Sequence, residues 1–151
     1  MISRFEQFSL SVSCIYRYIQ KIERVEMAKY GLKGPHAQCL LAMSRYSEGI
    51  TATELCALCD KDKAAISRTV AELEREGMVI REAKNGSMYR ALLKLTDQGR
   101  EAARQVDERA KFAVEKAGDC LTEEERTVMY RTLGMIAANL QTICAEGLEE
   151  Q

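Results

Sequence analysis

Apolar residues recur with a helical spacing at both ends of the chain. Near the start they alternate three and four residues apart, at Phe5, Phe8, Val12, Ile15, Ile19 and Ile22. This spacing places them in one stripe on a helix, which we expect to end near Tyr30, before Gly31, Gly34 and Pro35. Near the other end the alternation is four and three, at Met129, Leu133, Ile136, Leu140 and Ile143. That spacing is typical of helices packed side by side.

Start and stop signals divide the middle of the chain into three shorter helices. Pro35 is placed to open a helix that runs to about Tyr46. The capping box Thr51-Ala52-Thr53-Glu54 opens a third helix, which we expect to end by Asp60 with Leu55 and Leu58 buried. Asp62 is the next N-cap, and Gly77 provides the left-handed end of a helix that buries Ile66, Val70 and Leu73.

The pattern then changes from helical to alternating. Two runs with strand character, Met78 to Ala83 and Met88 to Leu95, flank Asn85-Gly86, a strong β-hairpin signal. Thr96 caps a fifth helix that runs to about Gly118, and a second capping box at Thr122 opens a sixth. The sequence therefore predicts a mainly α protein with six helices and one small hairpin.

Composition limits the classes of protein that this chain can belong to. Its 151 residues suit a single domain, 1–151. No run of about 18 apolar residues is present, and the first residues lack a signal-peptide pattern, so we expect a cytoplasmic protein with reduced cysteines. One His and the lack of a Gly-rich phosphate loop or a Gly-x-Ser-x-Gly motif argue against an enzyme, a metal site or a bound cofactor.

The order of the middle elements predicts a winged helix-turn-helix. A short helix, a tight turn, a second helix from Lys63 to Glu76 and a hairpin follow one another. In such a unit the second helix enters the DNA major groove and the hairpin forms a wing beside it. Buried residues at helical spacing join the two helices and leave Lys63, Ser67 and Arg68 facing outward.

The residues of this unit resemble the multiple-antibiotic-resistance-regulator (MarR) family. The resemblance rests on Asp62-Lys63-Ala64-Ala65-Ile66-Ser67-Arg68-Thr69-Val70, Leu73-Glu74, Gly77-Met78-Val79 and Leu95-Thr96 with Gly99. It implies a homodimeric, ligand-responsive repressor that binds a pseudo-palindromic double-stranded DNA operator. It further implies a DNA-binding lobe over residues 31–95 and dimerisation helices over 1–30 and 96–151.

The same resemblance assigns the candidate DNA contacts. Ala64, Ala65, Ser67 and Arg68 match the positions that the family directs into the major groove, where Ser and Arg read base edges or hold phosphates. Phosphate contacts are expected from Lys61 and Lys63, and from the hydroxyls of Thr51 and Thr53 at the start of the third helix. The alternative for Ser67 and Arg68 is an ordinary solvated helix face.

The wing departs from the family pattern. Where relatives often carry Asp-Arg-Arg, this chain has Ser87-Met88-Tyr89-Arg90. Arg90 is displaced by one position, and such a slip in a strand changes the face on which a side chain lies. Two alternatives remain open: Arg90 enters the minor groove, or Lys84 and Asn85 at the wing tip contact the backbone instead.

Relatives bind small aromatic anions in a crevice between the dimer helices and the DNA-binding lobe. That resemblance makes Tyr16, Arg17 and Arg45 candidate residues for a small aromatic or anionic effector. Cys14 in the first helix, with Tyr16 and Tyr18 nearby, also resembles the peroxide-sensing branch of the family, whose reactive Cys lies in that helix. The alternative function that this resemblance implies is a thiol-based redox or peroxide sensor using Cys14. We interpret Cys56 and Cys59 as small buried residues, Cys39, Cys120 and Cys144 as packing residues, and His36 as a helix-end residue.

The charge is uneven along the chain. The formal net charge is -1, but residues 61–94 hold eight Lys and Arg against five Asp and Glu. Residues 119–151 hold two Lys and Arg against seven Asp and Glu. The basic segment contains the proposed reading helix and wing, which favours a DNA partner over a helix-turn-helix that binds only protein.

Overall fold

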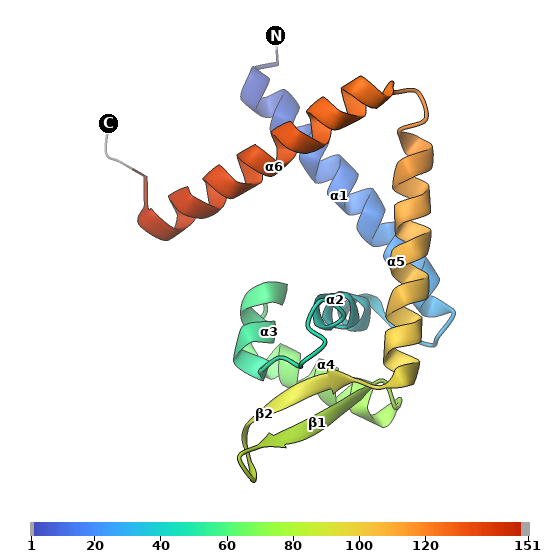
Figure 1. Cartoon of the computed structure of the whole chain (residues 1–151), viewed down its shortest axis with the longest axis vertical. Helices are drawn as coiled ribbons and strands as arrows, with labels where there is room; N and C mark the ends of the chain where they lie inside the picture. Colours follow the sequence, from blue (N-terminus) through green and yellow to red (C-terminus); the bar gives the residue numbers. More distant parts are fainter. Residues whose placement is uncertain (1, 149–151) are drawn as a thin grey trace. The chain divides into compact units, whose positions relative to one another are not determined.

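A computed structural model describes residues 2–148. Within these residues it contains six helices and one hairpin, which confirms the predicted fold class (Figure 1). In chain order the elements are α1 (Arg4–Ala28), α2 (Gly34–Met43), α3 (Ala52–Cys59), α4 (Lys63–Arg75), β1 (Val79–Lys84), β2 (Ser87–Leu95), α5 (Asp97–Ala117) and α6 (Glu123–Glu146). No helix in the described part is long and apolar enough to cross a membrane.

The chain divides into two compact units, Met1–Phe112 and Ala113–Gln151. The hydrophobic core lies in the first, where α2, α3 and α4 pack on one another and against the hairpin. Figure 1 shows these three helices gathered beside the two strands. Buried apolar residues that recur three or four apart on each helix create this core, and among its fully buried side chains are Leu40, Met43, Leu55, Ile66 and Leu73.

The hairpin has the turn that Asn85-Gly86 predicts. Both residues have positive φ angles, +53° and +75°, as a two-residue hairpin turn with the right twist requires. The strands are antiparallel, with Val79 opposite Leu95, and Ile50 adds an isolated bridge to Leu93. This bridge ties the segment before α3 to the wing strand.

Three expectations for the first unit are wrong in detail. Helix α2 ends at Met43 rather than near Tyr46, and the Ser44 hydroxyl donates to the Leu41 carbonyl at 2.8 Å as the chain turns. Leu58 is 50% exposed, whereas we expected it to be buried. On α3, Leu55 and Cys59 are buried in the core, and Ala52 and Cys56 are half-buried against it, so Cys56 is less buried than expected. Leu58 lies outside this buried stripe.

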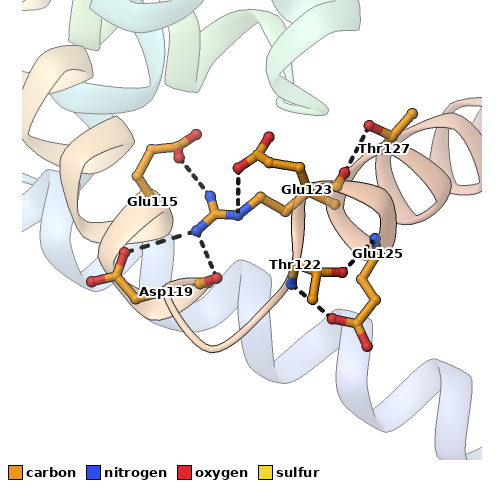
Figure 2. Close-up of polar contacts among 8 residues, drawn as sticks. Glu115, Asp119, Thr122, Glu123, Glu125 and Thr127 are labelled. Carbon is orange, nitrogen blue, oxygen red and sulfur yellow. Dashed lines mark hydrogen bonds and ion pairs between the residues drawn. The ribbon is translucent and has the colours of Figure 1, made fainter.

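The second unit is held at its corner by one guanidinium group (Figure 2). Arg126 donates to the Glu115 carboxylate at 2.8 Å and to the Gly118 carbonyl at 2.7 Å. Asp119 and Glu123 lie at ion-pair distances of 3.8 Å. The Arg126 side chain is only 16% exposed, so these contacts are less screened by water than ordinary surface pairs. The turn between α5 and α6 is thereby closed.

Candidate nucleic-acid interface

Helix α4 presents the predicted contact residues on one face. Its start is capped by Asp62, whose Oδ1 accepts the Ala65 amide at 2.7 Å. Ile66, Thr69, Val70 and Leu73 are buried, which fixes the orientation of the helix on the core. The opposite face carries Lys63, Ala64, Ser67 and Arg68 as exposed side chains, with Ala65 half-buried at its edge.

The turn between α3 and α4 is short and well defined. Asp60 ends α3 in the left-handed conformation, with φ +49°, and the Lys61 amide donates to the Cys56 carbonyl at 3.1 Å. The Gln38 amide group donates to the Cys59 carbonyl at 3.1 Å, which ties this turn to α2. Lys61 is exposed. It therefore stands in the turn directly before the exposed face of α4.

Thr51 and Thr53 have different roles at the start of α3. The Thr51 hydroxyl accepts the Glu54 amide at 3.3 Å and donates to the Glu54 carboxylate at 2.9 Å, so it is engaged as a cap. The pKa of Glu54 is lowered, first by the Thr51 backbone N–H and also by the charge of Lys84. Thr53 is exposed. Of the two, Thr53 is the more exposed, and Thr51 is the one engaged as a cap.

The wing contains an irregularity that the sequence did not reveal. The pairing shifts between Glu82 and Lys84, so that β2 carries extra residues opposite Ala83. Within this bulge Arg90 has a φ of +55°, a conformation that residues with a side chain rarely adopt. The Arg90 guanidinium lies 5.6 Å from the centre of the Tyr89 ring. A bulge re-aims side chains, so the position of Arg90 is set by the bulge and not by simple strand alternation.

The wing's other basic residues divide into two groups. Arg81 pairs with Glu74 at 2.8 Å and Lys94 pairs with Glu82 at 2.8 Å, so both are engaged within the protein. Lys84 and Asn85 are exposed at the tip of the hairpin, as expected. Tyr89, which sequence reasoning did not select, is 77% exposed beside Arg90. The displacement of Arg90 by one position from the family pattern was the sequence signal that could have pointed to Tyr89.

A cavity of about 410 Å³ lies between α1, α2 and the end of α3. Tyr16 and Arg45 line it as expected, but Arg17 is not among its lining residues and instead lies against the Tyr18 ring. Leu58, which is half exposed, also lines this cavity. Sequence reasoning missed two charged lining residues, Glu23 and Arg24, because their spacing carries no motif, and it assigned Lys61 only to DNA phosphates. Burial raises the pKa of Glu23, and Arg45 opposes this rise.

The cysteines fall into three environments. Cys39 and Cys59 are buried and their thiols are hydrogen-bonded, which raises the pKa of Cys39 and lowers that of Cys59. Cys14 is half-buried, with the Arg17 guanidinium 3.8 Å from its Sγ. Cys120 and Cys144 are exposed, so the packing role that we expected for them is not seen within this chain. Across residues 2–148, no three His, Cys, Asp or Glu residues form a metal-binding group.

Comparison with known proteins identifies related sequences. The sequence model of the MarR family matches residues 30–86, from the end of α1 to the wing tip. An uncharacterised HTH-type transcriptional regulator of Bacillus subtilis, YdgJ, is 30% identical over 105 residues, or 69% of this chain. The matched part spans 63% of the length of that relative.

Solved structures share the same fold over nearly the whole chain. A crystal structure of MarR is 26% identical and superposes with a TM-score of 0.77 over 97% of this chain and 99% of its own. A MarR regulator from Methanosarcina mazei reaches 0.79 at 22% identity, over 91% and 99% of the two chains. A MarR family regulator from Listeria monocytogenes, in complex with a 26mer DNA, reaches 0.71 at 19% identity, over 93% and 95%. With its winged helix-turn-helix and these relatives, the chain belongs to the MarR family.

Proposed function

We propose that this protein is a transcriptional regulator that binds double-stranded DNA through the exposed face of α4. The observation that carries the proposal is the combination of a firmly capped helix with an uncovered row of contact residues. Ser67 and Arg68 lie on that row, and their side chains can hydrogen-bond to base edges in the major groove. The structure of the Listeria monocytogenes relative in complex with DNA supports the same partner for this chain.

The second element of the proposal is the set of backbone contacts around α4. Lys61 and Lys63 flank its start, Thr53 stands on α3, and Lys84 and Asn85 form the wing tip. Arg90 lies in the irregular part of the same hairpin, with φ +55°. Cationic and hydroxyl groups of this kind hold phosphates and set the register on the duplex. The uneven charge of the chain supports this arrangement, because the basic segment contains α4 and the wing.

We further propose that the regulator is a homodimer. Helix α1 has an apolar face that is largely uncovered within the chain, including Phe5, Val12, Ile15 and Tyr18. Helix α6 has its own uncovered apolar residues, including Leu133, Leu140 and Ile143. Apolar faces of this extent are typical of interfaces. A twofold dimer would place two α4 helices in successive major grooves, about 34 Å apart, on a pseudo-palindromic site.

The cavity beside α1 and α2 supports an effector-responsive repressor. Arg24, Arg45 and Lys61 outnumber the single carboxylate of Glu23 among its charged lining residues. Together with Tyr16 and Leu58 they suit a small aromatic anion. Lys61 lines this cavity and also belongs to the turn before α4. An anion bound in the cavity would therefore lie against the segment that joins α3 to α4.

A thiol response at Cys14 is a second candidate, favoured by the Arg17 guanidinium 3.8 Å from its Sγ. Cys14 is also half-buried and not enclosed in the core, so its thiol can be reached. Rapid, stoichiometric alkylation of Cys14 ahead of the other five cysteines would support this candidate. Labelling of Cys14 no faster than that of the exposed Cys120 and Cys144 would remove it.

Selection of DNA from a random pool tests the main proposal. We expect one pseudo-palindromic sequence to be enriched and its binding to weaken steeply with added salt. Arg68→Ala should weaken binding to the selected DNA by about 1–3 kcal/mol if Arg68 contacts a base. Arg75→Ala, an exposed change at the far end of the same helix, is the matched control. Failure to enrich any sequence would overturn the proposal.

A further inference from the structure

His36 is the one histidine of the chain, and it joins two elements through both of its ring nitrogens. It stands in the first turn of α2 and is only 6% exposed. Its Nδ1 lies 3.0 Å from the backbone nitrogen of Lys33, and its Nε2 lies 2.5 Å from Oε2 of Glu72 on α4. The ring therefore connects the start of α2 to the proposed DNA-reading helix.

These two contacts determine which nitrogen carries the proton. The Lys33 backbone N–H can only donate, so Nδ1 accepts its hydrogen bond and is unprotonated. In a neutral ring the proton is then on Nε2, which donates to the Glu72 carboxylate. The pKa of Glu72 is accordingly lowered, first by this hydrogen bond from His36. A neutral ring of this tautomer satisfies both partners.

The contact between His36 and Glu72 matters because Glu72 lies on the same helix as Arg68. Glu72 follows Arg68 by four residues, so the two side chains are neighbours on one face of α4. Arg68, Glu72 and His36 also line the same cavity of about 300 Å³. A hydrogen bond at Glu72 therefore restrains the rotation of α4 one helical turn from Arg68.

We propose that His36 is a positioning residue for DNA recognition, and that its neutral Nε2–H form holds α4 at the angle at which Arg68 reaches its base. This inference rests on the proposed DNA-binding function of α4. It adds a residue outside the DNA-facing surface and a specific protonation state. His36 touches no DNA itself and acts through Glu72.

Protonation of His36 would disturb this arrangement. A proton on Nδ1 would face the Lys33 N–H, so two donors would oppose each other and the contact at the start of α2 would be lost. Glu72 stays ionised as the pH falls towards 5.5, because its pKa is lowered. The charged and titratable groups around the ring are Glu72, Arg68 and Arg75 from α4, Lys33 and Cys39 from α2 and its start, and Lys61 from the turn.

A nuclear magnetic resonance experiment tests the geometry without DNA. Because the chain has one histidine, its imidazole nitrogens give an unambiguous signal. We expect the Nε2–H tautomer for the neutral ring, and we expect the amides of Ala65 to Thr69 to shift as His36 is protonated. The Nδ1–H tautomer, or α4 amides that do not respond, would overturn the proposal. The resonance experiment uses no DNA, so it tests the His36 geometry independently. A protein that binds no DNA would overturn the proposed function of α4 instead.

DNA binding by variants of Glu72 tests the positioning role. Glu72→Ala removes the acceptor, whereas Glu72→Gln keeps one for the neutral Nε2–H. We expect Glu72→Ala to weaken binding to the selected DNA by about tenfold while non-specific binding persists, and Glu72→Gln to restore it. Glu76→Gln removes an equal charge from the end of α4 and is the matched control. Equal specific binding by the Ala and Gln variants would overturn the proposal.

The pH profile provides a readout that a merely structural role would not alter. His36→Asn keeps an acceptor for the Lys33 amide but is too short to reach Glu72 and does not titrate. We expect the wild-type protein to bind specific DNA about tenfold more tightly than this variant at pH 8. The advantage should shrink under acidic conditions that protonate the ring. Parallel profiles for the two proteins would contradict the requirement for a neutral ring.

Discussion

Gly99 lies against the backbone of Met78 so closely that a Cβ atom on Gly99 would stand 2.1 Å from the Met78 carbonyl oxygen. The same oxygen accepts the Thr96 amide at 2.9 Å. The Thr96 hydroxyl donates to the Gly77 carbonyl at 2.6 Å and accepts the Gly99 amide at 3.1 Å. The start of α5 is thus joined to the segment after α4 by backbone groups and the Thr96 hydroxyl, and only glycine fits at position 99.

Gly99→Ala should therefore destabilise the protein. The added methyl group meets backbone atoms, which cannot move aside as a flexible side chain can, and we expect a loss of about 1–3 kcal/mol or more in the free energy of unfolding. Urea denaturation measures this loss. Gln98→Ala, an exposed change in the same helical turn, should have little effect. A Gly99→Ala protein as stable as wild type would contradict the close contact.

Asp62→Ala should weaken α4 at its start. The carboxylate accepts the Ala65 amide at 2.7 Å, and losing such a cap costs about 1 kcal/mol. Hydrogen exchange of the Ala65 amide should accelerate, and binding to the selected DNA should weaken because Ser67 and Arg68 follow in the next turn. Asp62→Ser, which keeps a capping oxygen, should preserve most of the protection. Equal exchange in the Ala and Ser variants would exclude a capping role.

Arg126→Ala should loosen the corner between α5 and α6. We expect a loss of about 1–3 kcal/mol in the free energy of unfolding, because the Glu115 carboxylate and the Gly118 carbonyl lose a partly buried donor. Arg126→Lys should restore only part of it, since an ammonium group cannot span both acceptors as a guanidinium does. Arg131→Ala, an exposed change on α6, is the control. Full restoration of the free energy of unfolding by Arg126→Lys would show that a positive charge alone is sufficient to hold this corner.

The capping box of α6 should contribute a pH-dependent part of the stability. Glu125 accepts the Thr122 amide at 2.8 Å, and this backbone hydrogen bond is the first cause of its lowered pKa. A pKa that is lower in the folded state means that the contribution is complete above the ordinary Glu range. It is lost as the pH falls through the lowered value.

We therefore expect Glu125→Gln to be less stable than wild type at pH 7, with a smaller difference at pH 3. Urea denaturation at the two pH values measures the change. A Thr122→Ala background removes only the hydroxyl and keeps the backbone N–H that Glu125 accepts, so most of the pH-dependent difference should persist there. A difference that stays constant with pH would show that Glu125 does not act through its charge.

Ile15→Glu should shift the protein from dimer to monomer. Ile15 is 59% exposed on the apolar face of α1, and a carboxylate there would lose its hydration in an interface. Light scattering measures the molar mass, and binding to a palindromic DNA should weaken with dissociation. Ser13→Glu places the same charge elsewhere on α1 and should leave the dimer intact. An unchanged molar mass for Ile15→Glu would exclude this face from the interface.

Much of the fold could be predicted because its signals are local. The capping boxes at Thr51 and Thr122 and the N-cap at Asp62 all form as expected, since each involves only residues within one helical turn. The Asn85-Gly86 turn is equally local. Gly99 was recognisable only as part of a family pattern, and its contact with Met78 explains why that pattern requires glycine.

The candidate site was predictable only in part. The outward face of α4 followed from helical periodicity, because burying Ile66, Val70 and Leu73 leaves Ser67 and Arg68 outside. The exposure of Leu58 did not follow, since it depends on which neighbouring helices cover the short α3. The bulge around Arg90 was also hidden, because it arises from how two strands pair and not from one strand's composition.

By itself, the sequence determined the types and order of the helices and strands, the caps that begin the helices and the row of residues that α4 exposes. These features depend on periodicity and on contacts within a few residues. Only the tertiary structure decided that His36 meets Glu72, 36 residues away, and that Arg45 and Lys61 share a cavity with Tyr16. Such pairings depend on how separate elements pack together, and no local pattern records that packing.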